Sequence, residues 1–397
     1  MHFVTGRFGT IAALGSAQTL AWASSYYLPA MLATPIASDL ALAPPLVFAA
    51  FSLSLVVSAL VGPWTGRAID RWGGRPVLIG TNPLFALGLV ALGLAQGPMS
   101  LFAAWALIGL AMGSGLYDAA FATLVKLYGQ DARNPITGIT LIAGFASTVG
   151  WPLTALLEQQ FGWRGACFAW AALHLVLGLP LNLSLPRVAA PVPMTASVNT
   201  APADADLPFQ STDTGRISMV LAFMFAVTAF TSTAMAAHLP RLLQACGATL
   251  AVAVAVGALI GPAQVAGRLL EFGVLRRVHP LISARIAALS HALAAFALLL
   301  VGPSAAVLFA LVHGAGNGIL TIAKGTLPLV LFGPQGYGAR QGWLTMPARV
   351  AQAMAPFLFG WVLDRWGSAA LGLSAALGLL AFIALMLLPT AKPPASR

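Results

Sequence analysis

The stretch GPWTGRAIDRWGGRP, residues 62–76, contains four charged side chains, Arg67, Asp70, Arg71 and Arg75. Charge is rare elsewhere, because only 8% of the 397 residues are charged and 59% are hydrophobic. Long apolar runs flank the stretch, LVFAAFSLSLVVSALV before it and VLIGTNPLFALGLVALGLA after it. An apolar run of about 20 residues is long enough to cross the hydrocarbon of a bilayer as a helix. The stretch therefore reads as a charged loop between two membrane-spanning helices.

Such runs recur along the whole chain, which predicts an all-α membrane protein rather than a soluble one, since soluble domains carry roughly 25% charged residues. The alternation over short segments that marks a transmembrane β-barrel is missing. We expect twelve membrane helices, at residues 10–33, 45–67, 76–95, 100–127, 135–158, 165–185, 217–239, 249–270, 280–301, 303–332, 339–362 and 368–389.

Two halves of six helices each are indicated by an internal repeat. GPWTGRAID at 62–70 is echoed by GPAQVAGRLLE at 261–271, and an offset of 204 residues aligns Gly129 with Gly333 and Pro152 with Pro356. The sequence predicts an N-terminal bundle at 1–185, a flexible cytoplasmic linker at 186–216 and a C-terminal bundle with a short tail at 217–397. Duplicated bundles around a central site are typical of secondary transporters.

The distribution of lysine and arginine predicts the orientation. With both termini in the cytoplasm, Arg164, Arg241 and Arg365 fall outside, Lys324 and Arg349 fall within helices, and the remaining fifteen, Arg268 among them, lie on the cytoplasmic side. The net charge of +10 thus reflects membrane topology, and we expect no nucleic-acid partner. We predict a multi-pass protein of a bacterial inner membrane, present as a monomer.

The loop between the second and third helices resembles the signature loop of the major facilitator superfamily, whose pattern is G-x-x-x-D-R/K-x-G-R-R/K. Residues 66–75 of this chain read GRAIDRWGGR, with Gly74 where the family usually has a basic residue. The resemblance implies the twelve-helix fold, movement of a substrate by rocker-switch alternating access, and a latch on the inner face formed by Gly66, Asp70, Arg71, Gly73 and Arg75. Asp70 would accept hydrogen bonds from the amino end of a facing helix, and Arg71 and Arg75 would pair with acidic groups.

Residues 133–153, followed by FGWRGA at 161–166, resemble the fifth helix of the monocarboxylate-porter and oxalate/formate-antiporter branch. This resemblance implies transport of a small, monocarboxylate-like organic anion by proton symport or by exchange. The branch has an acid four residues before an arginine in the eighth helix, and here Gln264 replaces the acid before Arg268.

Candidate substrate-binding residues are polar or aromatic side chains expected near the middle of the membrane. An ionisable residue there costs at least about 2.5–3.5 kcal/mol on insertion, so each is a functional hypothesis. Arg349 would grip a carboxylate with two parallel hydrogen bonds, unless it is held structurally by carbonyls or a buried acid. We add Gln352 beside it, His313 and Asn317 in the tenth helix, and Trp22 and Tyr26 in the first. His313 would bind substrate, carry a proton, or only pack.

Asp118 and Lys324 are expected at similar depths in the fourth and tenth helices, as an ion pair that gates the inner side. The alternatives are that Asp118 pairs with Arg71 or Arg75 of the latch, or that it carries the coupled proton. The sequence has no phosphate-binding loop and no metalloprotease motif, so we expect no enzyme activity, no cofactor and no metal. The alternative functions are efflux of drugs or metalloid oxyanions and, more remotely, a membrane sensor on the same fold.

Overall fold

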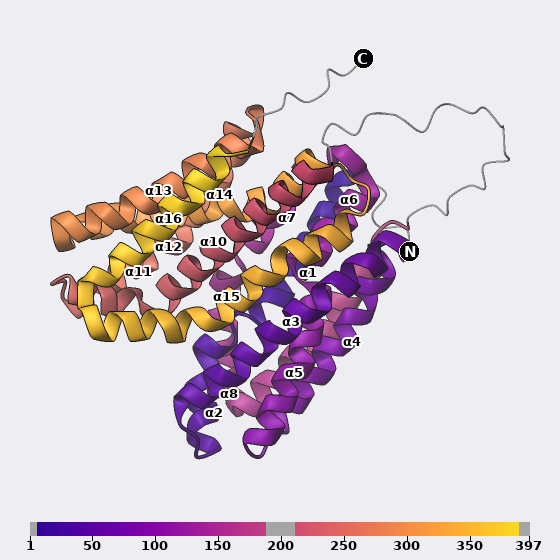
Figure 1. Ribbon diagram of the computed structural model, residues 1–397. Helices are drawn as coiled ribbons and strands as arrows, with labels where there is room; N and C mark the ends of the chain where they lie inside the picture. Colours follow the sequence, from indigo (N-terminus) through magenta and orange to yellow (C-terminus); the bar gives the residue numbers. More distant parts are fainter. Residues whose placement is uncertain (1–5, 188–210, 389–397) are drawn as a thin grey trace, which may run out of the picture.

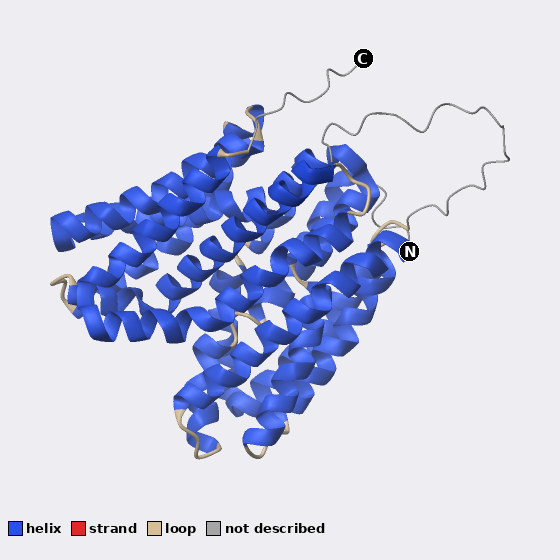
Figure 2. Cartoon of the chain, in the orientation of Figure 1, coloured by secondary structure: helices blue, strands red, loops and turns tan. Residues whose placement is uncertain are grey.

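The computed structural model describes residues 6–187 and 211–388. Within these ranges the regular structure is entirely helical (Figure 2). This is the arrangement expected in a bilayer, where a helix satisfies its own backbone hydrogen bonds. The helices are α1 Arg7–Ala23, α2 Pro29–Asp39, α3 Pro44–Trp72, α4 Gly74–Gly93, α5 Pro98–Gly115, α6 Tyr117–Tyr128, α7 Arg133–Ala143, α8 Ala146–Leu173, α9 Leu179–Leu183, α10 Ser211–Ala245, α11 Leu250–Ala258, α12 Ile260–Gly273, α13 Pro280–Val301, α14 Ala306–Phe332, α15 Tyr337–Trp366 and α16 Ala370–Met386.

Seven helical stretches among the described residues are long and apolar enough to cross a membrane. The three longest, Pro98–Leu183, Pro280–Phe332 and Tyr337–Met386, run over 86, 53 and 50 residues. One crossing takes about 20 residues, so each of these three contains more than one crossing. The chain is therefore a multi-pass helical membrane protein, as the sequence predicts.

Several predicted helices differ from the observed ones, and those expected at 100–127, 135–158 and 249–270 are each interrupted, at Leu116, at 144–145 and at Leu259. The helix expected at 10–33 is not continuous, because α1 ends at Ala23, residues 24–28 form turns, and α2 begins at Pro29. The seventh predicted helix begins at Ser211 rather than 217, so it takes in the end of the expected linker. The rest of that linker, 188–210, lies outside the described residues.

The helices of the first half, indigo to magenta in Figure 1, lie against those of the second half, red to yellow. The main seam joins α3 to α15, and smaller seams join α15 to α6 and α12 to α7. One end of the bundle brings together Arg7, which lies 3.6 Å from Asp131, and Lys126, whose Nζ donates to the Asp70 carbonyl at 2.8 Å. We call this the termini end, because α1 begins there and α16 ends toward the same side in Figure 1.

The internal repeat is visible in the backbone. Gly129 ends α6 and Gly333 ends α14, at the equivalent position 204 residues later. Both have a positive φ, 56° and 78°, a region that L-residues with a side chain rarely adopt. The helices that follow these turns, α7 and α15, each lead away from the termini end along the facing half.

Candidate functional site

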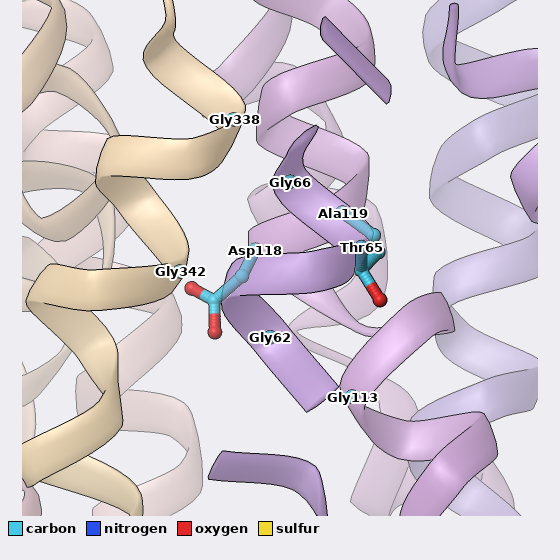
Figure 3. A pocket seen from close by; sticks show the side chains of 8 residues that line it. All are labelled: Gly62, Thr65, Gly66, Gly113, Asp118, Ala119, Gly338 and Gly342. Atoms are coloured by element: carbon cyan, nitrogen blue, oxygen red, sulfur yellow. The ribbon is translucent and has the colours of Figure 1, made fainter. Parts of the chain in front are cut away.

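Asp118 owes its position to a break in the predicted fourth helix. α5 ends at Gly115, Leu116 is extended with ψ −168°, and α6 starts at Tyr117. Asp118 thus stands in the first turn of α6, where the positive end of the helix dipole favours a carboxylate. In Figure 3 its side chain lies between the glycines of α3 and those of α15, in a small pocket at the seam of the two halves.

The Asp118 carboxylate contacts three side chains of the second half. Its Oδ2 lies 3.2 Å from Arg349 Nη2, and its Oδ1 lies 3.8 Å from Lys324 Nζ. Oδ1 also accepts a hydrogen bond from Gln341 Nε2 at 3.2 Å, and the same nitrogen lies 3.3 Å from the Lys324 carbonyl. We call Asp118, Lys324, Gln341 and Arg349 the central cluster. It is an ionic link between the halves.

The central cluster answers two questions that the sequence leaves open. Asp118 pairs with Lys324, as the first alternative has it, and not with Arg71 or Arg75. Arg349 does have a buried acid as its partner, and that acid is again Asp118. Gln341 was not anticipated, because helical spacing gives the depth of a residue but not the partner that faces it from the other half.

We predict that Asp118→Asn destabilises the protein. The substitution leaves Arg349, only 4% exposed, without a carboxylate, and breaking one partner of a buried pair costs about 3–5 kcal/mol. The melting temperature in detergent should fall clearly.

The matched control is Asp39→Asn, because Asp39 pairs with Arg164 at 3.0 Å but is half exposed, so its loss should cost about 1 kcal/mol or less. Adding Lys324→Gln to Asp118→Asn should restore only part of the stability, since Arg349 remains unpaired. Equal melting temperatures for Asp118→Asn and Asp39→Asn would contradict the prediction.

Aromatic side chains from the first half lie next to Arg349. Its Cζ is 6.0 Å from the centre of the Trp22 ring, and its Nη1 donates to Gln352 Oε1 at 3.3 Å. Trp22 contacts Tyr26, Tyr27 and Tyr117 at centroid distances of 5.2, 6.2 and 4.9 Å. We call these four residues the aromatic wall. Four predicted substrate residues, Arg349, Gln352, Trp22 and Tyr26, are thus brought together.

The other two predicted substrate residues are placed differently. The His313 ring packs on His291 and Phe309, at centroid distances of 4.4 and 5.2 Å, inside the second half. Asn317 is half-buried one turn further along α14, and its carbonyl accepts a hydrogen bond from Thr321. Of the roles considered for His313, these contacts fit packing.

Arg268 is the residue that sequence reasoning missed. It was assigned to the cytoplasmic rim, yet it is 5% exposed, and its Nε and Nη1 have no hydrogen-bond partner among the described residues. Gly144, directly after α7, makes room for its guanidinium, because a Cβ there would overlap Nη1. The signal in the sequence was an arginine inside an apolar helix, read as lying too near its end.

The predicted latch residue Asp70 caps α15. Its Oδ1 and Oδ2 accept hydrogen bonds from the backbone N–H groups of Gly338 and Ala339, both at 2.9 Å. This capping requires close contact between α3 and α15. A glycine at position 66 permits the contact, because a Cβ there would overlap the Gly338 carbonyl. One turn away, a Cβ at Gly342 would come within 2.6 Å of Gly62. Small residues four apart let two helices in a membrane approach backbone to backbone.

The remaining latch residues do not match the expectation of ion pairs with acids. Arg75 donates to the Leu183 carbonyl at 2.7 Å, and Arg71 lies over the Trp72 ring. Gly73 has φ 82° and ends α3, a conformation that favours glycine. Gly74, where the signature pattern has a basic residue, has no room for a side chain, because a Cβ there would overlap the Thr123 hydroxyl.

A second closure joins the halves at the termini end. Arg133 of α7 lies 3.2 Å from Glu271 of α12 and also donates to the carbonyls of Val278 and Leu275. Glu271 is buried, so the pair is shielded from solvent. Together with the Asp70 cap and the central cluster, this contact closes the seam at that end.

Among the described residues, no group of three or more His, Cys, Asp and Glu side chains is placed to hold a metal.

Comparisons with known proteins agree with this geometry. The family model of the Major Facilitator Superfamily matches residues 14–323. The 3-(3-hydroxy-phenyl)propionate transporter of Escherichia coli is 30% identical over 38% of this chain and 34% of its own length. Mouse monocarboxylate transporter 11 is 33% identical over 35% of this chain and 33% of its own length. An MFS-type efflux pump of Mycolicibacterium smegmatis is 32% identical over 43% of this chain and 41% of its own length. The matched region thus spans less than half of each of these relatives.

Solved structures extend the similarity to nearly the whole chain. The human organic anion transporter MFSD10 covers 96% of this chain and 99% of its own, with a TM-score of 0.69 and 17% identity. The transporter FucP in its outward conformation covers the same shares, with a TM-score of 0.72 and 15% identity. At these identities the likeness concerns the fold. The family match, the helical membrane fold and the glycine-lined seam capped by Asp70 together place this chain in the major facilitator superfamily, a family of transporters.

Proposed function

We propose that this protein is a secondary active transporter of a small, monocarboxylate-like organic anion. The observation that carries the proposal is an excess of positive charge where the halves meet. Lys324 and Arg349 share one carboxylate there, Asp118, and Arg268 is buried on α12 with no partner for Nε and Nη1 among the described residues, while the nearby Glu271 pairs with Arg133. Uncompensated positive charge inside a membrane is costly, so its presence here is consistent with a binding site for an anion.

Arg268 offers the open position for that anion. Its Nε and Nη1, on different edges of the planar guanidinium, have no hydrogen-bond partner among the described residues, so the buried cation keeps donors for the oxygens of an anion. The aromatic wall, which lies next to Arg349, suits the apolar part of an organic acid. The names of the relatives agree with this chemistry, since they include a 3-(3-hydroxy-phenyl)propionate transporter and monocarboxylate transporters.

Transport would proceed by alternating access of the two halves, with proton symport or exchange as the coupling. A substrate carboxylate would compete with Asp118 for Arg349, and a proton on Asp118 would weaken the same ionic link. If the termini lie in the cytoplasm of a bacterium, as the basic residues predict, the seam closed at the termini end corresponds to an outward-facing state.

The test is a carboxylate-driven pH change in proteoliposomes. Purified protein would be sealed in vesicles with a pH-sensitive dye, and lactate, benzoate, 3-phenylpropionate and oxalate would be added in turn, with protein-free vesicles as the leak control. We expect a signal for at least one acid. We expect Arg268→Gln to lower its transport efficiency by about two orders of magnitude, because a charged contact to the substrate is lost.

The matched control is Arg285→Gln. Arg285 is also a helix arginine, but it donates to the Leu385 and Leu388 carbonyls within the second half, so the variant should transport normally. Wild-type efficiency in Arg268→Gln would overturn the anion site. Silence with all four acids in the pH assay, and again in counterflow of labelled acid, would overturn carboxylate transport.

Efflux is the second candidate, and the aromatic wall favours it because large drug-like molecules bind to such surfaces. Two relatives have matching names, the efflux pump of Mycolicibacterium smegmatis and the multidrug resistance protein fnx1 of Schizosaccharomyces pombe. Ethidium export from cells separates the candidates. An efflux pump for cations should export ethidium with Arg268→Gln as well as with the wild type.

A further inference from the structure

The first membrane segment is broken where the aromatic wall begins. The helical hydrogen bonds of α1 end at Ser24, whose N–H donates to the Leu20 carbonyl at 3.0 Å. Tyr27 N–H then donates to the Trp22 carbonyl at 3.1 Å, a wider turn than that of an α-helix. Trp22, Tyr26 and Tyr27 all lie at or within this break, so its geometry determines where their rings stand.

A buried polar chain from two other helices holds the break. Ser24 Oγ lies 2.8 Å from His174 Nε2, and His174 Nδ1 lies 3.3 Å from Asn82 Oδ1. The Asn82 amide nitrogen donates to the Leu78 carbonyl at 2.9 Å, so its oxygen faces the imidazole. This assigns the imidazole proton to Nδ1, and the Ser24 hydroxyl is shared between Nε2 and the Leu20 carbonyl, each 2.8 Å from its Oγ. All three side chains are at most 4% exposed.

The backbone around His174 is shaped to bring it there. Residues His174–Gly178 form a short π-helix. This form is rare in proteins as a whole, and where it occurs it is often at a functional site. Gly178 lets this turn approach the chain, because a Cβ there would overlap Asn82 Oδ1 and lie 3.0 Å from Leu20. The His174 ring also stacks on Phe85 at 4.6 Å. The imidazole is therefore fixed by stacking and aimed at the break by hydrogen bonds.

The break carries a contact between the halves. Tyr26 OH lies 3.3 Å from Thr233 Oγ1 of α10, and Trp22 faces the Arg349 guanidinium. We propose that His174 is a positioning residue for transport. Through Ser24 it holds the break of the first helix, and so it places Trp22 and Tyr26 against the substrate and against α10. The part that concerns substrate rests on the proposed function, whereas the contact with α10 does not.

The first experiment measures transport of whichever carboxylate gives a signal in proteoliposomes. His174→Phe keeps the stacking on Phe85 and the size of the ring but removes both hydrogen bonds. We expect KM to rise roughly tenfold, the effect of losing a buried hydrogen bond that orders the site, with the maximal rate and the melting temperature nearly unchanged. His174→Gln, whose amide can both donate and accept, should recover most of the affinity.

Two comparisons separate positioning from a general packing role. Ser24→Ala should raise KM, and combining it with His174→Phe should add little, because both remove the same link. The matched control is His291→Phe, another buried histidine that packs on an aromatic neighbour, but in the second half and away from the break. It should leave KM unchanged. An unchanged KM in His174→Phe, or an equal rise in His291→Phe, would overturn the inference.

The second experiment does not depend on the substrate. Cysteines would replace Tyr26 and Thr233 in a chain whose Cys167 and Cys246 are changed to alanine, and a short bis-methanethiosulfonate reagent would link them. We expect cross-linking with native His174, a fall of roughly tenfold with His174→Phe, and no fall with His291→Phe. Unchanged cross-linking in His174→Phe overturns the positioning role. A fall without any carboxylate transport supports it and counts only against the proposed substrate.

Discussion

Arg349→Gln is expected to abolish carboxylate transport while leaving a folded protein in the membrane. The glutamine amide can still donate to Asp118 and to Gln352, but the substitution removes the positive charge that meets both Asp118 and the aromatic wall. The fold should survive because Asp118 keeps a cation, Lys324, 3.8 Å from its Oδ1. Transport should fall to the level of protein-free vesicles, since the substrate loses the cation that it would take over from Asp118.

The measurement is the same dye assay at matched protein content, together with the melting temperature in detergent. Arg349→Lys is the informative control, because it keeps the charge but lacks the planar pair of donors. It should retain a measurable fraction of the rate. Arg349→Gln protein that transports at the wild-type rate would show that Arg349 only neutralises Asp118.

The second large effect is expected at the seam of α3 and α15. In Gly66→Ala the new methyl group would overlap the Gly338 carbonyl, so the two helices must move apart. In Gly62→Ala the nearest atom of the facing helix is 3.7 Å away, an ordinary contact. One added methyl group of the same kind should therefore disrupt the seam at position 66 and be tolerated at position 62. Overpacking of this kind costs about 1–3 kcal/mol.

Labelling of a single cysteine tests this difference. Ala119 lines the pocket beside Asp118 and is 3% exposed, so Ala119→Cys should react slowly with a maleimide while the seam is closed. Gly66→Ala should speed the labelling roughly tenfold, the equivalent of about 1.4 kcal/mol. Gly62→Ala and Gly80→Ala should not, because a Cβ at Gly80 meets nothing within 4 Å. Equal labelling in Gly62→Ala and Gly66→Ala would contradict the backbone contact.

The fold was largely predictable because membrane helices are recognised by composition and length alone. The break at 24–28 was not, because the apolar run continues after the four polar residues Ser24 to Tyr27, and the partner of Ser24 is a histidine 150 residues away. Repeat spacing did place Asp118 opposite Lys324, because duplicated halves set equal depths. The same kind of reasoning grouped His313 with Arg349, yet the ring of His313 turns toward His291.

Residues with an unexpected partner show where sequence reasoning ends. Arg349 meets Asp118 across 231 positions of sequence, and no local pattern encodes which way a side chain faces around its helix. Arg268 was placed by its distance from the helix end, whereas its guanidinium lies in the room left by Gly144, a residue directly after α7 in the other half. The sequence gives the depth of a residue along its helix, whereas packing between helices decides which way its side chain points.

The bond between Asp70 and α15 also has a genetic consequence. One partner is a side chain, but the other is the peptide backbone of residues 338 and 339. Most single-base changes at codon 70 therefore destroy the contact, whereas at codon 339 nearly every residue except proline still supplies the amide. A saturation library should show strong purifying selection on one side of the bond and near-neutral drift on the other, and a compensating second-site change in the side chain of residue 339 should never be recovered.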